Sequence, residues 1–437
     1  MIIKGNWTEA KKEMENNKNN SVSFIYKEKN KKNEGVLKDV VCTIKDIFAT
    51  KDAKTQASSL FLENFEPSYN ATVVQKLLDQ GASFVAKVHN DELALGGEGI
   101  YSAYGLIHHP LDLKRKIGGS SSGSAATFSK NIGFALASDT GDSVRLPASY
   151  IGKVGFKPSY GAVSRYGMFA YASSLDTVSW FNHNVADCVE IAKVLFGKDE
   201  KDLTSIDVKI DNAAKKKPLK IAFFDLKVDD YISNQFNKLI NKLKQETTVE
   251  KVEVNEILLK AVKPVYEIIS YSEASSNLAN LNAIAFGKRE QGENWEQIME
   301  NSRSKNLGKM VQKRIILGSF FLEKENQEEL FLKAQKIRRI IKNYLDDIHS
   351  KYDILIYPAA SSIAPLINET KIFNYVDSIL TASNLAWNPS ITLKLGTDEK
   401  EKLPFNLAID AKLYHDEKLL SYSLWIEEKI KELENGK

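Results

Sequence analysis

Hydrophobic residues recur along the chain with two different periods, which predict alternating strands and helices. Short, nearly continuous apolar runs are typical of buried strands, and we expect strands at 22–26, 36–45, 84–88, 134–137, 219–224, 352–358, 391–395 and 406–409. Apolar positions three or four residues apart predict helices, at 9–19, 71–81, 186–196, 232–245, 256–282, 295–299, 310–322, 330–348 and 417–435. This succession predicts an α/β fold with a helix-rich layer in its second half.

Composition narrows the class of protein without naming it. The 437 residues, 43% of them hydrophobic, suffice for one large domain with a full core. A net charge of +3 gives no electrostatic case for nucleic-acid binding by this chain alone. The two cysteines lack CxxC spacing, the six histidines lack metal-ligand spacing, and we find no glycine-rich phosphate loop. With no hydrophobic leader and no apolar run near about 18 residues, we expect a soluble, reduced, cytoplasmic protein.

One stretch, Gly118–Ser149, concentrates the candidate chemistry. It reads GGSSSGSAATFSKNIGFALASDTGDSVRLPAS: a Gly/Ser loop, a short buried strand, and a strand-to-helix turn with Ser143 at its tip. Such a turn directs several backbone N–H groups into one space at the positive end of a helix, where an oxyanion can be held. The alternative is a pair of flexible surface loops, which Gly/Ser clusters often form.

The same stretch resembles the signature of the amidase-signature family, G-G-S-S-G-G-S…G-x-D-x-G-G-S-I-R-x-P. The resemblance implies a Ser–Ser–Lys triad and a central mixed β-sheet covered by helices on both faces. The triad would be Ser143 as nucleophile, Ser120 as proton relay and Lys45, which lies 75 residues before Ser120 in a matching I-K-D segment. It also implies a cis peptide bond before Ser120 and an oxyanion hole made by the backbone of Thr140, Gly141, Asp142 and Ser143.

Three departures from the signature affect the expected site. Ser122 and Asp142 stand where the family has glycine, and the spacing between Ser120 and Ser143 is one residue shorter. A carboxylate directed at an oxyanion disfavours the transition state, so we expect the Asp142 side chain to face outward or to pair with a cation.

Two competing interpretations involve neighbouring residues. Lys87 also closes a predicted strand, but its distance along the chain to Ser120 does not match the family. Gly119–Gly123 matches G-x-S-x-G with Ser121 at the centre, the nucleophile elbow of α/β-hydrolases. That elbow should follow a hydrophobic strand, and Leu111–Ile117 is too polar for one.

Within the family, the strongest resemblance is to the glutamine-hydrolysing subunits of tRNA-dependent amidotransferases. It spans roughly residues 36–395 and rests on motifs such as Phe156–Gly161 and Lys313–Gly318, although Trp387 replaces a family glycine. It implies that Arg314 binds the glutamine α-carboxylate, Asp377 its α-ammonium, and that Tyr266 lines the pocket. The alternatives are a surface ion pair for Arg314 and a helix cap for Asp377. We expect one domain over 1–437, comprising a polar segment 1–35, a catalytic half 36–205 and a second half 219–437.

The resemblance also implies partners. Ammonia from glutamine would pass to a B subunit that converts Glu-tRNA(Gln) to Gln-tRNA(Gln), while a C subunit wraps around this chain. ATP and magnesium would be bound by the partner, with no cofactor in this chain and no membrane association. A free-standing amidase of small amides and a non-catalytic scaffold subunit remain as alternatives.

Overall fold

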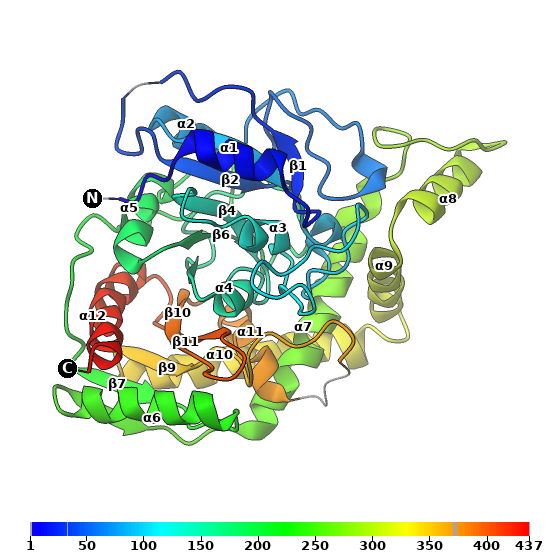
Figure 1. Cartoon of the computed structure of the whole chain (residues 1–437). Coiled ribbons are helices and arrows are strands. Elements are labelled where there is room, and N and C mark those ends of the chain that lie inside the picture. The colour runs from blue at the N-terminus through cyan, green and yellow to red at the C-terminus, as the bar shows by residue number, and fades with distance from the viewer. Residues whose placement is uncertain (1, 33, 370–373, 437) are drawn as a thin grey trace.

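The computed structural model describes residues 2–32, 34–369 and 374–436, within which eleven strands form a single mixed sheet (Figure 1). Their order across the sheet is β1-β3-β2-β4-β6-β5-β10-β11-β9-β7-β8. In chain order the strands are β1 Val22–Ile25, β2 Val41–Lys45, β3 Ser83–Val88, β4 Phe134–Asp139, β5 Val154–Lys157, β6 Thr177–Asn182, β7 Lys220–Phe223, β8 Thr248–Lys251, β9 Ile354–Pro358, β10 Ser390–Thr397 and β11 Pro404–Asp410.

Parallel pairing is confined to two groups of strands. Strands β3, β2 and β4 run parallel to one another, as do β9, β7 and β8, and antiparallel strands join the two groups. The carboxyl ends of parallel neighbours meet at one edge of a sheet. The end of β2, at Lys45, therefore lies beside the end of β4.

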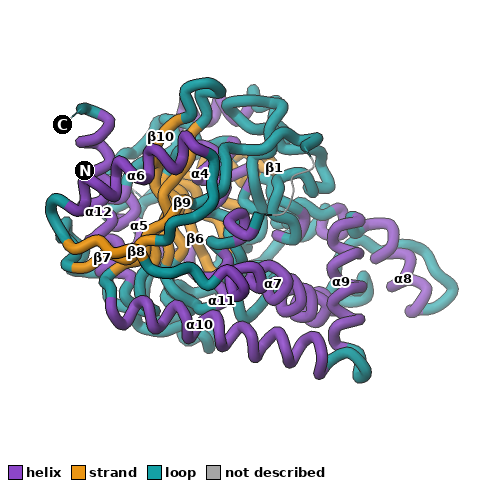
Figure 2. Tube along the Cα trace, turned by 90° about the horizontal axis from the view of Figure 1, so that it is seen from below, coloured by secondary structure: helices purple, strands orange, loops and turns teal. Residues whose placement is uncertain are grey.

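Helices cover both faces of this sheet, as predicted. Figure 2 shows strands of the second half between α6 and α10, and both views place α8 at the outer end of an arm formed with α7 and α9. The α-helices are α1 Trp7–Glu15, α2 Thr72–Asp79, α3 Ser122–Ala126, α4 Arg145–Ile151, α5 Val185–Leu195, α6 Asp230–Lys244, α7 Glu256–Asn277, α8 Trp295–Asn306, α9 Lys309–Leu322, α10 Lys333–Lys351, α11 Thr381–Leu385 and α12 Asp416–Glu434.

Strand β4 shows how the sequence separates the two faces. Phe134 and Leu136 enter the larger core, whereas Ala135 and Ala137 point the other way, into a smaller core with residues of α1, α3 and α4. Successive side chains of a strand alternate between faces, so large and small residues segregate. The small side chains let α3 and α4, which carry the signature, lie close to the sheet.

Most predicted elements are present, with boundaries shifted by a few residues. The sequence analysis missed β5, β6 and β8, along with the short helices α3 and α11. Strand β5 contains Gly155, where an added Cβ would lie 2.7 Å from the Ala148 Cβ on α4. This glycine weakens the strand pattern in the sequence, yet it permits close packing of α4 on the sheet.

Candidate active site

Lys45 ends β2 and is fully buried. Its Nζ donates hydrogen bonds to three serine hydroxyls: Ser120 Oγ at 2.7 Å, Ser138 Oγ at 3.0 Å and Ser121 Oγ at 3.1 Å. Burial lowers the pKa of Lys45 to about 7, partly opposed by the surrounding carboxylates, of which Asp91 has the largest effect. A neutral amine, able to accept a proton, is therefore accessible near neutral pH.

Ser120 follows a cis peptide bond from Gly119, at the position expected from the sequence. Gly119 is enclosed so tightly that an added Cβ would lie 2.2 Å from Asp91 Oδ2. The Asp91 carboxylate accepts hydrogen bonds from the backbone amides of Gly97, Gly99 and Tyr101. Asp91 thus fixes the loop that packs against Gly119 and Ser120.

The strand-to-helix turn at Ser143 is held by a buried ion pair. Asp139, the last residue of β4, accepts hydrogen bonds from the backbone amides of Val144 and Arg145 at the start of α4. The Arg145 guanidinium pairs with this carboxylate at 3.0 Å and donates to the Gly141 carbonyl at 2.7 Å. Both ends of the turn are therefore tied to one buried pair.

The backbone amides of this turn are available to a ligand. Within the described part of the chain, the amides of Gly141, Asp142 and Ser143 have no protein acceptor. The Ser143 carbonyl accepts a hydrogen bond from the Ser121 amide at 3.2 Å, which joins the two ends of the signature. These amides lie beside the N-terminus of α4 and suit an oxyanion.

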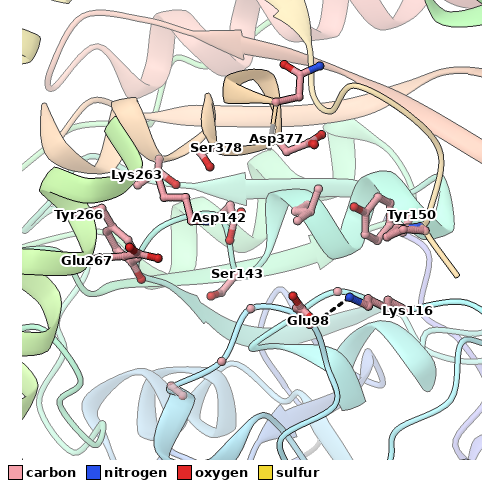
Figure 3. A pocket seen from close by; sticks show the side chains of 18 of the residues that line it. Glu98, Lys116, Asp142, Ser143, Tyr150, Lys263, Tyr266, Glu267, Asp377 and Ser378 are labelled. Carbon is pink, nitrogen blue, oxygen red and sulfur yellow. Dashed lines mark hydrogen bonds and ion pairs between the residues drawn. The ribbon is translucent and has the colours of Figure 1, made fainter. Parts of the chain in front are cut away.

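A cavity of about 540 Å³ opens over Ser143 (Figure 3). Its lining includes all three residues assigned to glutamine binding, namely Arg314, Asp377 and Tyr266. The Tyr266 ring covers the oxyanion turn, because an added Cβ on Gly141 would lie 3.0 Å from its Cζ. The structure therefore brings the predicted pocket residues to the predicted nucleophile.

Arg314 is fixed in this cavity by uncharged partners. The residue is 7% exposed, and its guanidinium donates to Tyr171 Oη at 2.8 Å and to the Gly96 carbonyl at 2.6 Å. It also lies over the Tyr271 ring, 4.9 Å from the centroid. The Nε atom is buried without a protein partner in the described structure. These contacts leave the positive charge uncompensated at close range, so Arg314 is suited to bind an anion rather than to form a surface ion pair.

Asp377 lies within the short 3-10 helix Tyr375–Ser378. The N-cap of this helix is Asn374, whose side chain accepts a hydrogen bond from the Val376 amide, so the Asp377 side chain is not the cap. One Asp377 oxygen accepts hydrogen bonds from the amide and hydroxyl of Ser361, while the residue lines the cavity. The alternative interpretation as a helix cap is therefore wrong.

The expectation for Asp142 is also wrong. Its half-buried side chain lines the cavity rather than facing outward, and no cation of the described residues forms an ion pair with it. Burial and the neighbouring Asp139 raise the pKa of Asp142 to about 7, against the opposing effect of Arg145 and Arg314. The backbone of the turn dictates this direction, which residue type alone did not reveal.

Lys87 and Ser121, the alternative candidates for catalytic residues, contact other groups. Lys87 forms a buried ion pair with Asp46 at 3.0 Å and donates to the Lys54 carbonyl at 2.7 Å. The Ser121 hydroxyl donates to the Ser138 carbonyl and contacts Lys45 instead of a histidine. Segment 111–117 forms no strand. Neither Lys87 nor Ser121 is therefore arranged as the alternative interpretations require.

No cluster of metal-ligating side chains occurs among the described residues. No described helix is long and apolar enough to cross a membrane.

Sequence reasoning assigned no role in the site to two buried carboxylates, Glu92 and Asp176. Glu92 is buried and accepts hydrogen bonds from Ser59 Oγ and from the Gly308 amide, just before α9. Thr140 donates to the buried Asp176 carboxylate at 2.7 Å. Glu92 lies in an N-D-E-L-A motif that resembles the family, but only the fold shows that it contacts the helix carrying Arg314.

Comparisons with known proteins identify the family to which this chain belongs. The family model described as Amidase matches residues 16–420, so the chain belongs to the amidase family. The resemblance seen in the signature is thereby confirmed. Solved amidase structures share the fold, including one at 23% identity with a TM-score of 0.79 over 97% of this chain and 94% of the other.

More specific similarity is to one branch of the family. The chain is 36% identical to the A subunit of glutamyl-tRNA(Gln) amidotransferase from Mycoplasma genitalium, covering 94% of this chain and 90% of that protein. It is 35% identical to the protein of the same name from Saccharolobus solfataricus, with coverages of 92% and 86%. The crystal structure of the corresponding Thermotoga maritima protein matches with a TM-score of 0.79 at 31% identity, covering 95% of this chain and 89% of that one.

Proposed function

We propose that this chain is the glutaminase subunit of a tRNA-dependent amidotransferase. The observation that carries the proposal is the buried Lys45 Nζ, 2.7 Å from Ser120 Oγ, beside a cavity that holds both Ser143 and Arg314. Similarity to the A subunits of glutamyl-tRNA(Gln) amidotransferases over most of the chain supports the choice of glutamine. The product ammonia would convert Glu-tRNA(Gln) to Gln-tRNA(Gln) on a partner B subunit, with a C subunit completing the complex.

The proposed reaction begins with a proton transfer. Ser143 Oγ attacks the side-chain amide carbon of glutamine while its proton passes through Ser120 to the neutral amine of Lys45. The amides of the Thr140–Ser143 turn stabilise the oxyanion, and each such donor contributes about 2.7–4 kcal/mol. Lys45 returns the proton through Ser120 to the departing nitrogen, so ammonia leaves and a γ-glutamyl ester remains on Ser143.

Water completes the cycle by the same route in reverse. Lys45, again neutral, accepts a proton from the attacking water through Ser120 and returns it by the same path to Ser143 Oγ, so the ester is cleaved to glutamate and free Ser143. Arg314 would hold the α-carboxylate of the substrate by charge-assisted hydrogen bonds, and Asp377 its α-ammonium. ATP and magnesium belong to the partner that activates the glutamate on the tRNA, and this chain needs no cofactor for hydrolysis.

The test is ammonia release from L-glutamine by the chain co-expressed with its B and C partners. Wild type is compared with Ser143→Ala, with and without ATP and Glu-tRNA. The proposal expects release that Ser143→Ala abolishes and that ATP and Glu-tRNA stimulate. Hydrolysis of simple amides by the chain alone, without release from glutamine, would make it a free-standing amidase. Absence of any release would make it a scaffold.

A further inference from the structure

Asp142 places a carboxyl group in the cavity lining, immediately before the nucleophile. Figure 3 shows Asp142 and Ser143 next to each other on the cavity wall. The Asp142 side chain has no hydrogen-bond or ion-pair partner among the described residues. Its carboxylate oxygens are not among the fully buried atoms that lack a partner, so they remain accessible from the cavity. An accessible carboxylate without a protein partner can accept a donor from a ligand.

The cavity has two electrostatic poles. Arg314 supplies the positive pole, and its buried Nε has no hydrogen-bond acceptor among the described residues. The rest of the lining is predominantly acidic: its charged residues are Glu98, Lys116, Asp142, Lys263, Glu267, Arg314, Glu369 and Asp377. Lys116 is paired with Glu98 at 2.7 Å. A ligand that carries both an anion and a cation complements this lining better than one that carries an anion alone.

We propose that Asp142 is a specificity residue that binds the α-ammonium of the substrate, opposite an α-carboxylate on Arg314, and so restricts hydrolysis to amides of α-amino acids. This inference rests on the proposed function and deepens it. Asp377 and Asp142 share the ammonium, which has three N–H donors. One Asp377 oxygen already accepts two hydrogen bonds from Ser361, so a second carboxylate completes the site.

The position of Asp142 gives the bound ammonium a second effect. A carboxylate next to the oxyanion turn repels the negative charge that develops in the transition state. An ammonium bound to Asp142 offsets that repulsion. Burial raises the pKa of Asp142, so the cavity alone does not stabilise its ionised form, whereas a cationic ligand does. Amides without an α-amino group would leave the carboxylate uncompensated and react slowly.

The experiment compares two substrates in the co-expressed complex: L-glutamine and its deamino analogue 4-carbamoylbutanoate. Values of kcat/KM are measured at fixed pH for wild type, Asp142→Asn and Asp142→Gly. Glu267→Gln serves as a matched variant, because it removes another carboxylate from the cavity lining. Circular dichroism and complex purification confirm that each variant folds and assembles.

A change in substrate preference is the expected result. Both Asp142 variants should lower kcat/KM for glutamine by about 10- to 100-fold, the loss of one charge-assisted hydrogen bond. The same variants should leave hydrolysis of the deamino analogue unchanged or faster, whereas Glu267→Gln should affect both substrates equally. Equal effects of the Asp142 variants on both substrates would overturn the inference. Failure of wild type to hydrolyse glutamine would instead overturn the proposed function.

Discussion

Lys45 Nζ lies 2.7 Å from Ser120 Oγ, although 75 residues separate the two in the chain. The parallel pairing of β2 with β4 places Lys45 beside the carboxyl end of β4, where its Nζ contacts Ser138 as well as Ser120 in the loop before α3. The lysine is fully buried, so its ammonium form is penalised and its amine form favoured. This pair is the structural basis of the proposed proton relay.

Glutamine hydrolysis should depend on pH through the protonation state of Lys45. The pKa of Lys45 is lowered to about 7, and only the neutral amine can accept the proton from Ser120. We expect kcat/KM to fall tenfold per unit below about pH 7 and to level off above it. The Lys45→Arg variant, which cannot lose its proton, should be inactive over the whole range. An active Lys45→Arg enzyme would refute the role of the amine.

Arg145 supports the oxyanion turn from the protein interior. Besides Asp139 and Gly141, its guanidinium donates to the Leu380 carbonyl and to the side chains of Ser383, Ser390 and Asn384. Arg145→Lys retains the charge but cannot form this set of bonds. We expect a loss of about 3–5 kcal/mol in stability, measured by denaturant unfolding. Arg339→Lys on the exposed face of α10 is the control, expected within about 0.5 kcal/mol of wild type.

Glu92 should make stability depend on pH. Burial raises its pKa from 4.5 to about 7, so the folded protein binds a proton that the unfolded chain has released. The stability contributed by the neutral carboxyl is present below pH 4.5 and is lost as pH rises to 7. We expect Glu92→Gln to gain about 3 kcal/mol relative to wild type between pH 5 and pH 8, measured as melting temperatures. A constant difference across this range would show that Glu92 is not protonated.

Gly141 contacts the Tyr266 ring closely enough to limit its replacement. An added Cβ would lie 3.0 Å from Tyr266 Cζ and 3.2 Å from its Oη, so the turn or the ring must move. We expect Gly141→Ala to lower kcat roughly 10- to 100-fold with little change in melting temperature. The double variant with Tyr266→Leu should recover part of the loss of kcat. If it recovers none, the steric explanation fails.

Much of the site was predictable because its signals are local in sequence. Lys45 closes an apolar strand, and Ser120 and Ser143 lie in Gly-rich turns at the ends of a short strand. The structure brings Lys45 Nζ to Ser120 Oγ at 2.7 Å, and it joins the Ser121 amide to the Ser143 carbonyl at 3.2 Å. The mixed sheet and most of its helices followed from periodicity and from the family resemblance, since long amphipathic segments carry strong signals.

Features that depend on tertiary context were not predictable. Strand β8, Thr248–Lys251, is short and polar because it forms the edge of the sheet. Trp387 has a φ of 69°, a conformation that favours the glycine found there in the family. Its indole donates to the Ser174 carbonyl at 2.7 Å and stacks on Tyr160, contacts that only the fold supplies. The inward direction of Asp142 is likewise set by the turn that precedes α4.

The most direct test of the proposed mechanism is detection of the covalent intermediate. The co-expressed complex is mixed with L-glutamine, quenched in acid, digested and analysed by mass spectrometry. Ser143→Ala is compared with Ser129→Ala, which removes a serine hydroxyl that does not line the cavity. We predict a γ-glutamyl group on the peptide that contains Ser143 in wild type and Ser129→Ala, and none in Ser143→Ala. A γ-glutamyl group on another residue, or ammonia release at the wild-type rate by Ser143→Ala, would contradict the account.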